Sequence, residues 1–262
     1  MVQLHCGNAV DILKTFPASY VDCTVTSPPY YQLRRYNHPD EIGNEVRCSE
    51  YIAKLGDVFR EVYRITKPTG VCFINIGDTY LGQQQLGVPF KLLDEVLRHG
   101  WKFRQMLIWQ KVSPMPSSVK NRFTDSHEYI LFLVKKSNYY FDMSLIQEPA
   151  TYAGKSRGGS KRRYEQNNAQ MDNKIYDTRN PRTVFTIRQE YTQPEGSSVK
   201  HYARFPKELI TPFITAGCPA DGVVLDPFCG SGTTLEVAKN QGKRSIGIDI
   251  IKEYIEDVYA RW

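Results

Sequence analysis

Apolar runs that are typical of buried strands alternate along most of the chain with segments whose apolar residues recur at helical spacing. In the longest such segment, which begins at 49–52, apolar residues recur from Ile52 to Ile65, and Pro68 and Gly70 are expected to end it. The predicted strands are 2–6, 21–26, 71–76, 103–109, 129–134, 223–225 and 245–248. The predicted helices are 9–15, the segment from 49, 90–98, 205–215, 233–240 and the segment from 252. This alternation predicts an α/β fold with a doubly wound, mostly parallel sheet and helices on both faces.

Two parts of the chain depart from the alternation. The connection between strands 103–109 and 129–134 is too short for a crossover helix, so we expect an antiparallel hairpin there. The stretch from about 137 to 198 is rich in Gly, Ser, Asn, Arg, Lys and Tyr and has little apolar periodicity, which predicts loops or a small subdomain. One α/β domain is therefore expected in two halves, 1–136 and 201–262, around an insertion over 137–200.

The charge of the chain points weakly to a polyanionic partner. The net charge is +6, a modest excess that many proteins without such partners share. Its distribution is more informative, because five basic residues of the insertion follow one another with no acidic residue between them: Lys155, Arg157, Lys161, Arg162 and Arg163.

The cysteines and the apolar runs limit the class of protein. None of the six cysteines has a C-x-x-C spacing or a histidine at metal-ligand spacing, so we expect free thiols and no metal site. No apolar run approaches the roughly 20 residues of a membrane helix, and no signal peptide precedes the first strand. A cytoplasmic protein with no membrane contact is expected.

The segment after strand 223–225 has the features of a nucleoside site. Gly230 and Gly232 allow a tight turn and a close backbone approach to a ligand at the start of the next helix. Asp249 follows about 20 residues later at the end of the next predicted strand, where acidic side chains of nucleotide-binding α/β units reach ribose hydroxyls.

Three cofactor classes compete for this site. A P-loop needs Lys before Ser or Thr after the glycines, and Thr233-Thr234 stand there instead; a dinucleotide site has a third spaced glycine, which is missing. S-adenosylmethionine carries no phosphate and needs a carboxylate for its ammonium, an acid for its ribose and an apolar slot for adenine. Asp226, Asp249 and Phe228 suit these three tasks, which favours S-adenosylmethionine.

Ser27-Pro28-Pro29-Tyr30 follows strand 21–26, at the sheet edge where open α/β folds bind ligands. The prolines remove two amide donors, so the loop presents acceptors. The Ser27 hydroxyl and the Pro28 carbonyl could accept both hydrogens of an exocyclic amino group, with Tyr30 stacked on the ring that bears it. Methylation of C5 of cytosine is disfavoured because the loop offers no cysteine nucleophile. The chemistry fits the amino group of cytosine or of adenine.

Both motifs, in this order, resemble those of a known family. Thr26-Ser27-Pro28-Pro29-Tyr30 followed by Asp226-Pro227-Phe228-Cys229-Gly230-Ser231-Gly232-Thr233-Thr234 is similar to the amino-methylating DNA methyltransferases of the beta class, whose catalytic motif precedes the cofactor motif. The resemblance implies a Rossmann-like, S-adenosylmethionine-dependent fold. It makes 1–136 the catalytic half, 201–262 the cofactor-binding half and 137–200 the target-recognition region.

The resemblance also implies the residues of the cofactor site. Phe205 is expected at the methionine end, and Asn8 stands where the family often has an Asp that contacts adenine. The full expected set is Asn8, Thr26, Phe205, Asp226, Pro227, Phe228, Gly230, Ser231, Gly232, Thr233 and Asp249.

Duplex DNA is the partner that the resemblance implies, with the target base flipped out of the stack. Segments 109–111 and 116–123 resemble the family's target side. The residues expected to contact DNA are Lys111, Lys120, Arg122, Lys155, Arg157, Lys161, Arg162 and Arg163.

In the family, Ser at the first catalytic position is associated mostly with N4 of cytosine, and Asp or Asn with adenine. We therefore expect a site-specific N4-cytosine DNA methyltransferase. An N6-adenine enzyme of the same fold is the first alternative, followed by an RNA methyltransferase and a DNA-binding protein without catalysis. A cognate restriction endonuclease is a possible partner. The oligomeric state is open, with a homodimer as one option.

Overall fold

The computed structural model of the chain describes residues 1–35, 38–150, 177–189, 196 and 204–262. It divides into a larger unit of Met1–Phe141 with Thr183–Trp262, and a smaller unit of Asp142–Arg182. Within the described ranges, no helix combines the length and the apolar character that a membrane crossing requires.

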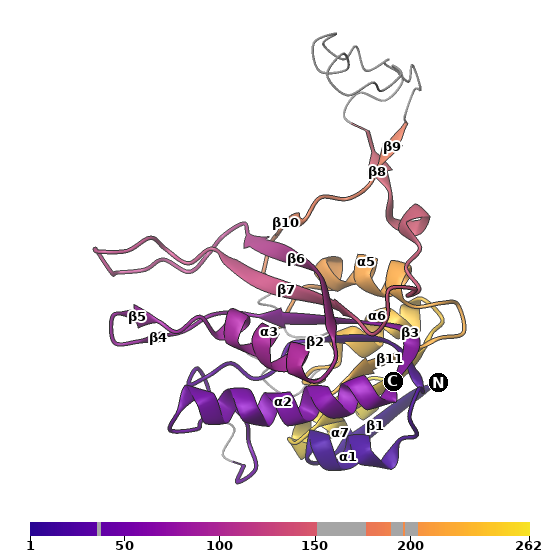
Figure 1. Cartoon of the computed structure of the whole chain (residues 1–262), viewed down its shortest axis with the longest axis horizontal. Coiled ribbons are helices and arrows are strands. Elements are labelled where there is room, and N and C mark those ends of the chain that lie inside the picture. The colour runs from indigo at the N-terminus through magenta and orange to yellow at the C-terminus, as the bar shows by residue number, and fades with distance from the viewer. Residues whose placement is uncertain (36–37, 151–176, 190–195, 197–203) are drawn as a thin grey trace. The chain divides into compact units, whose positions relative to one another are not determined.

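The larger unit is built on one eight-stranded sheet in the order β1-β12-β11-β2-β3-β7-β6-β10 (Figure 1). The strands are β1 Val2–Cys6, β2 Val21–Thr26, β3 Thr66–Ile76, β6 Lys102–Lys111, β7 His127–Val134, β10 Val184–Ile187, β11 Val223–Asp226 and β12 Arg244–Asp249. Neighbours from β1 to β3 are parallel, β7 is antiparallel to both β3 and β6, and β10 is parallel to β6. The predicted mostly parallel sheet with an antiparallel hairpin is confirmed.

Helices cover both faces of this sheet (Figure 1). They are α1 Ala9–Thr15, α2 Cys48–Ile65, α3 Val88–Arg98, α5 Lys207–Gly217, α6 Thr233–Asn240 and α7 Lys252–Ala260. Alternate residues of β3 point to opposite faces: Cys72 and Ile74 pack with α1, α2 and α3, whereas Phe73 packs with α5 and α6. Phe73 stacks on Phe213 of α5 with 4.6 Å between ring centroids. The doubly wound arrangement is thus confirmed.

Three details differ from the sequence-based expectation. Strand β3 begins at Thr66, directly after α2, because Thr66 pairs with Val21. The register shifts before the Cys23–Val71 pair, so the turn residues that were expected to precede the strand lie within it. Strand β10 lies inside the expected insertion, yet Val184 pairs with Ile108 of the main sheet. A short hairpin of β4 Tyr80–Leu81 and β5 Gln84–Gln85 was also not predicted.

The described part of the smaller unit is a 3-10 turn, η1 Met143–Ile146, and a two-stranded hairpin of β8 Glu148–Pro149 with β9 Thr178–Arg179. Arg179 forms an ion pair with Glu148 at 3.3 Å. The basic cluster expected to contact DNA (Lys155, Arg157, Lys161, Arg162 and Arg163) lies outside the described residues.

Candidate active site

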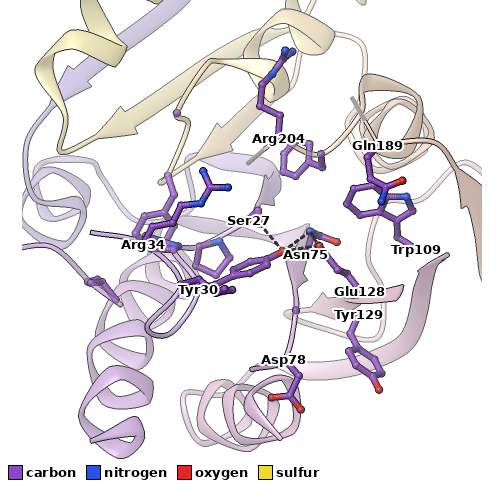
Figure 2. A pocket seen from close by; sticks show the side chains of 18 of the residues that line it. Ser27, Tyr30, Arg34, Asn75, Asp78, Trp109, Glu128, Tyr129, Gln189 and Arg204 are labelled. Atoms are coloured by element: carbon purple, nitrogen blue, oxygen red, sulfur yellow. Dashed lines mark hydrogen bonds between the residues drawn. The ribbon is translucent and has the colours of Figure 1, made fainter. Parts of the chain in front are cut away.

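A cavity of about 730 Å³ opens at the carboxyl edge of the sheet. The segments that follow the parallel strands β1, β2, β3, β11 and β12 all line it: 7–9, 27–30, 77–78, 227–231 and 249–251. Residues of β6, β7 and the connection between them also line the cavity. Figure 2 shows Trp109, Glu128 and Tyr129 on the side of the cavity away from Arg34. Both sequence motifs therefore lie on one cavity, whose size is typical of small-molecule sites.

The catalytic motif and Asp226 of the cofactor motif meet beneath this cavity. Asp226 is 2% exposed and is not among the lining residues. Its Oδ1 accepts from the Thr26 hydroxyl at 2.6 Å and from the Phe228 amide at 3.1 Å, and its Oδ2 accepts from the Thr234 hydroxyl at 2.6 Å. Burial raises the pKa of Asp226 to about 6. These three bonds fix the orientation of the carboxylate, and its expected contact with an ammonium stays a prediction.

The turn after β11 brings the backbone to the cavity. Gly230 lines the cavity, and its amide donates to Oδ2 of Asp249 at 2.8 Å. Gly232 caps α6 with a φ of +79°, and a Cβ at this position would come within 3.0 Å of Val258. Glycine is therefore required at 232 by the fold, although that residue does not line the cavity.

Asp249 is a cavity carboxylate, as the spacing predicted. Its two oxygens accept from the amides of Gly230 and Ile251, at 2.8 and 2.9 Å. Burial raises its pKa to about 6, and the two amide bonds oppose that rise. The carboxylate is fixed in orientation and can still accept further hydrogen bonds from a ligand.

The remaining cofactor candidates divide between the cavity wall and the protein interior. Asn8, Phe205, Pro227, Phe228 and Ser231 line the cavity together with Gly230 and Asp249, whereas Thr26, Asp226, Gly232 and Thr233 do not. Asn8 also caps α1, because its Oδ1 accepts from the Val10 amide at 2.9 Å.

A hydrogen-bonded cluster joins the loop after β2 to the residues of β3, β6 and β7 that line the cavity (Figure 2). The Tyr30 hydroxyl donates to Oε2 of Glu128 at 2.5 Å and accepts from the Ser27 hydroxyl at 3.3 Å and from Nδ2 of Asn75 at 3.0 Å. Lys111 Nζ lies 2.6 Å from Oε1 of Glu128. Burial and the adjacent Glu128 carboxylate raise the pKa of Tyr30 well above its ordinary value.

Sequence reasoning missed the part that Glu128 takes in this cluster. The available signal was a charged residue directly before the apolar run 129–134. Asp78 also lines the cavity, and its carboxylate accepts from the amides of Gly87 and Val88 at the start of α3. Gln189, which also lines the cavity and donates to the Ser113 carbonyl at 3.0 Å, gave no sequence signal.

The basic residues that were expected to contact DNA and that the structure describes differ in their surroundings. Lys111 is paired with Glu128 inside the cavity, so its charge is already partly neutralised. Arg122 lies at the cavity rim, 3.8 Å from the centre of the Tyr80 ring and 2.5 Å from Asp125. Lys120 is exposed on the connection between β6 and β7 and does not line the cavity.

The sequence matches the family described as DNA methylase, which covers both N6 and N4 methyltransferases, over residues 21–260. The chain belongs to this family. Membership confirms the expected resemblance, the fold, the methyltransferase function and S-adenosylmethionine as the cofactor of this DNA methylase.

Curated relatives and solved structures agree with this assignment. The chain is 34% identical to the type II methyltransferase M.SmaI of Serratia marcescens, over 96% of this chain and 87% of that one. It is 31% identical to M.Cfr9I of Citrobacter freundii, over 95% and 84%. Among solved structures, the PvuII DNA methyltransferase, described as cytosine-N4-specific, is similar in fold with a TM-score of 0.76, at 20% identity over 100% of this chain and 86% of that one.

Proposed function

We propose that this DNA methylase transfers a methyl group from S-adenosylmethionine to the N4 amino group of cytosine in a specific duplex sequence. The observation that carries the proposal is the position of Ser27. Its hydroxyl lines the cavity, and its hydrogen points to Tyr30, so its lone pairs are available to accept from an amino group.

The cofactor is proposed to occupy the part of the cavity next to β1, β11 and β12. Asp249 would accept from the ribose hydroxyls, Asn8 would bond the adenine edge through its Nδ2, and Phe228 would cover the adenine ring. Phe205 and Ser231 would lie towards the methionine end. Support comes from the fact that all of these residues line the same cavity. Asp226 would act indirectly, by fixing the turn that carries Phe228 and Gly230.

The target base is proposed to enter between the Pro-Pro loop and β7. S-adenosylmethionine supplies an electrophilic methyl group. Ser27 and the Pro28 carbonyl would hold the two amino hydrogens and so aim the nitrogen lone pair at that methyl group, while the Tyr30 ring would stack on the base. Much of the rate enhancement would then come from positioning.

Cytosine is favoured over adenine by the Ser at the first catalytic position and by the fold similarity to an enzyme described as cytosine-N4-specific. N6 of adenine is the alternative, because the family covers both reactions.

The proposed partner is duplex DNA, with the target nucleotide flipped into the cavity. Lys120 and Arg122 lie on the connection next to the cavity and would contact phosphates together with the basic cluster of the target-recognition region. The relatives are type II methyltransferases, which supports a cognate restriction endonuclease as a further partner.

Methyl transfer to nucleic acid is the direct test. Purified protein is incubated with S-adenosylmethionine labelled in its methyl group and with unmethylated duplex DNA, the separated strands, or RNA. We expect label in duplex DNA for the native chain and a loss of at least 100-fold for Ser27→Ala. Label in RNA alone, or equal label with Ser27→Ala, would contradict the proposal.

A further inference from the structure

Ser27, Tyr30 and Glu128 form a continuous hydrogen-bonded chain along the cavity wall (Figure 2), and this chain ends at an ion pair. The chain begins at the Ser27 hydroxyl, passes through the Tyr30 hydroxyl and ends at the Glu128 carboxylate. Lys111 pairs with the other oxygen of that carboxylate. Three segments far apart in sequence, the loop after β2, β7 and β6, supply these groups.

The direction of each bond follows from the chemistry of the end group. An ionised carboxylate can only accept, so the Tyr30 hydroxyl must donate its hydrogen to Glu128. The lone pairs of the Tyr30 oxygen then accept from Ser27 and from Nδ2 of Asn75. Every hydrogen along this series of bonds therefore points from Ser27 towards Glu128.

We propose that this chain is the proton exit of the methyl-transfer reaction, with Glu128 as the terminal proton acceptor. The inference rests on the proposed contact between Ser27 and the target amino group. After the transfer, the nitrogen carries the new methyl group, its two original hydrogens and a positive charge. One of these hydrogens must leave to give the neutral methylamino product.

Each hydroxyl between the nitrogen and Glu128 gains one proton and loses one. The nitrogen releases a proton to the Ser27 oxygen, Ser27 releases its own proton to the Tyr30 oxygen, and Tyr30 releases its own proton to Oε2 of Glu128. Ser27 and Tyr30 end as neutral hydroxyls, and Glu128 ends as a neutral carboxylic acid. No oxidant, reductant or further reactant is needed.

The surroundings of Glu128 suit a transient acceptor. The titratable or charged groups in contact with its carboxylate are Tyr30 and Lys111, and Asn75 donates to it at 2.7 Å. The Glu128 and Lys111 side chains are 10% and 24% exposed, so the acid that forms is close to water and can release its proton there.

The Tyr30 hydroxyl keeps its own proton in the resting enzyme. Burial and the adjacent carboxylate hold the pKa of Tyr30 well above its ordinary value. It therefore stands as a neutral hydroxyl between Ser27 and Glu128, able to pass one proton on as it receives another.

The alternative is that Glu128 only tethers the Tyr30 ring. Tyr30→Phe and Glu128→Gln test the relay with little change in shape, because each keeps the size of the side chain. Tyr31→Phe is the matched control: the Tyr31 hydroxyl is also part-buried, but it donates to the Val46 carbonyl at 3.2 Å and is not linked to Ser27.

The methylation rate is measured with enzyme in excess over sites, on unmethylated genomic DNA, together with the affinities for S-adenosylmethionine and DNA. For Tyr30→Phe and Glu128→Gln we expect rates at least 100-fold lower, within the range of about 10²–10⁴ for a lost acid–base group. Both affinities should stay within about twofold, and Tyr31→Phe should keep the native rate. A native rate for Tyr30→Phe would overturn the relay.

Chemical rescue separates proton transfer from tethering. In Glu128→Ala, added formate and acetate should restore part of the rate, and acetate, the stronger base, should restore more at equal occupancy. Rescue that does not depend on basicity, or no rescue, would overturn the acceptor role. Methylation by the unsubstituted protein distinguishes failure of the relay from failure of the proposed function. Methylation of adenine would leave the relay intact, whereas no methylation of any DNA would overturn the relay and the proposed function together.

Discussion

The Tyr51 hydroxyl of α2 donates to the carbonyl oxygen of Pro29 over 2.8 Å. Tyr51 is fully buried, and its ring packs against Tyr31 with 5.3 Å between centroids. The bond joins the core of the α2 layer to the Pro-Pro loop and fixes which way the Pro29 carbonyl points. The adjacent Pro28 carbonyl, proposed to accept from the target amino group, is thereby held in position.

Tyr51→Phe should therefore impair both stability and catalysis. The phenylalanine keeps the packing but leaves the Pro29 carbonyl without its donor, which should lower the free energy of unfolding by about 1 kcal/mol. The methylation rate should fall by about tenfold because the loop loses its tether. Urea unfolding and single-turnover methylation measure the two effects. A variant that matches the native chain in both would show that the loop is held by other contacts.

Tyr30→Ala should abolish turnover and spare cofactor binding. The proposed stacking platform lies on the target side of the cavity, whereas Asp249 and Phe228 lie on the cofactor side. Titration calorimetry with S-adenosylmethionine should give a dissociation constant within about twofold of the native value. Phe205→Ala should give the opposite result, a weaker affinity for the cofactor. A large loss of cofactor affinity in Tyr30→Ala would refute this division of the cavity.

Stability should depend on pH through Asp226 and Asp249. Both pKa values are raised to about 6 by burial, so the folded chain binds protons more readily than the unfolded chain in this range. Their contribution to stability is complete below about pH 4, the usual range for Asp, and is lost as the pH rises through about 6. Urea unfolding without cofactor should therefore show a smaller loss between pH 4.5 and 6.5 in Asp249→Asn than in the native chain.

Cofactor affinity should change in the opposite sense. The proposed role of Asp249 needs an ionised carboxylate that accepts from ribose hydroxyls, so binding should strengthen as the pH rises through about 6. Calorimetry at pH 6 in two buffers of different ionisation enthalpy should detect proton release on binding. Proton uptake, or the same affinity at pH 5 and pH 7, would contradict this role.

Charge reversal across Lys161, Arg162 and Arg163 should weaken DNA binding and flatten its dependence on salt. Each phosphate contact that is lost removes close to one unit from the slope of the logarithm of affinity against the logarithm of salt concentration. Affinity measured between 50 and 200 mM salt tests this. An unchanged slope would exclude the cluster from phosphate contact.

Much of the fold could be predicted because its strands and helices bury periodic faces. Strand β2 alternates Val21, Cys23 and Val25 with polar residues, and all of it is buried. The cap at Asn8 follows from the capping preference of its side chain. Strand β10 could not be predicted, because only one of its four residues, Ile187, is buried and its existence depends on pairing with β6. Tertiary context decides such short strands.

The candidate active site, like the fold, could be predicted only in part. Sequence order and motif spacing were enough to bring Ser27 and Asp249 to one edge of the sheet. The orientation of Asp226 depends on the hydroxyls of Thr26 and Thr234, which donate to its Oδ1 and Oδ2, and motif spacing alone does not specify these bonds. The position of Glu128 depends on the register of β7 against β6, where it pairs with Trp109. Register between distant strands is set by packing, so the contact with Tyr30 emerged only from the structure.

Nucleoside analysis of the methylated product tests the central claim most directly. Unmethylated DNA is treated with the native chain and isotope-labelled S-adenosylmethionine, digested to nucleosides and examined by mass spectrometry. We expect label in N4-methylcytosine. Label in N6-methyladenine would contradict the choice of base made from Ser27, and the absence of label from DNA, with cofactor binding shown separately, would contradict the proposed reaction.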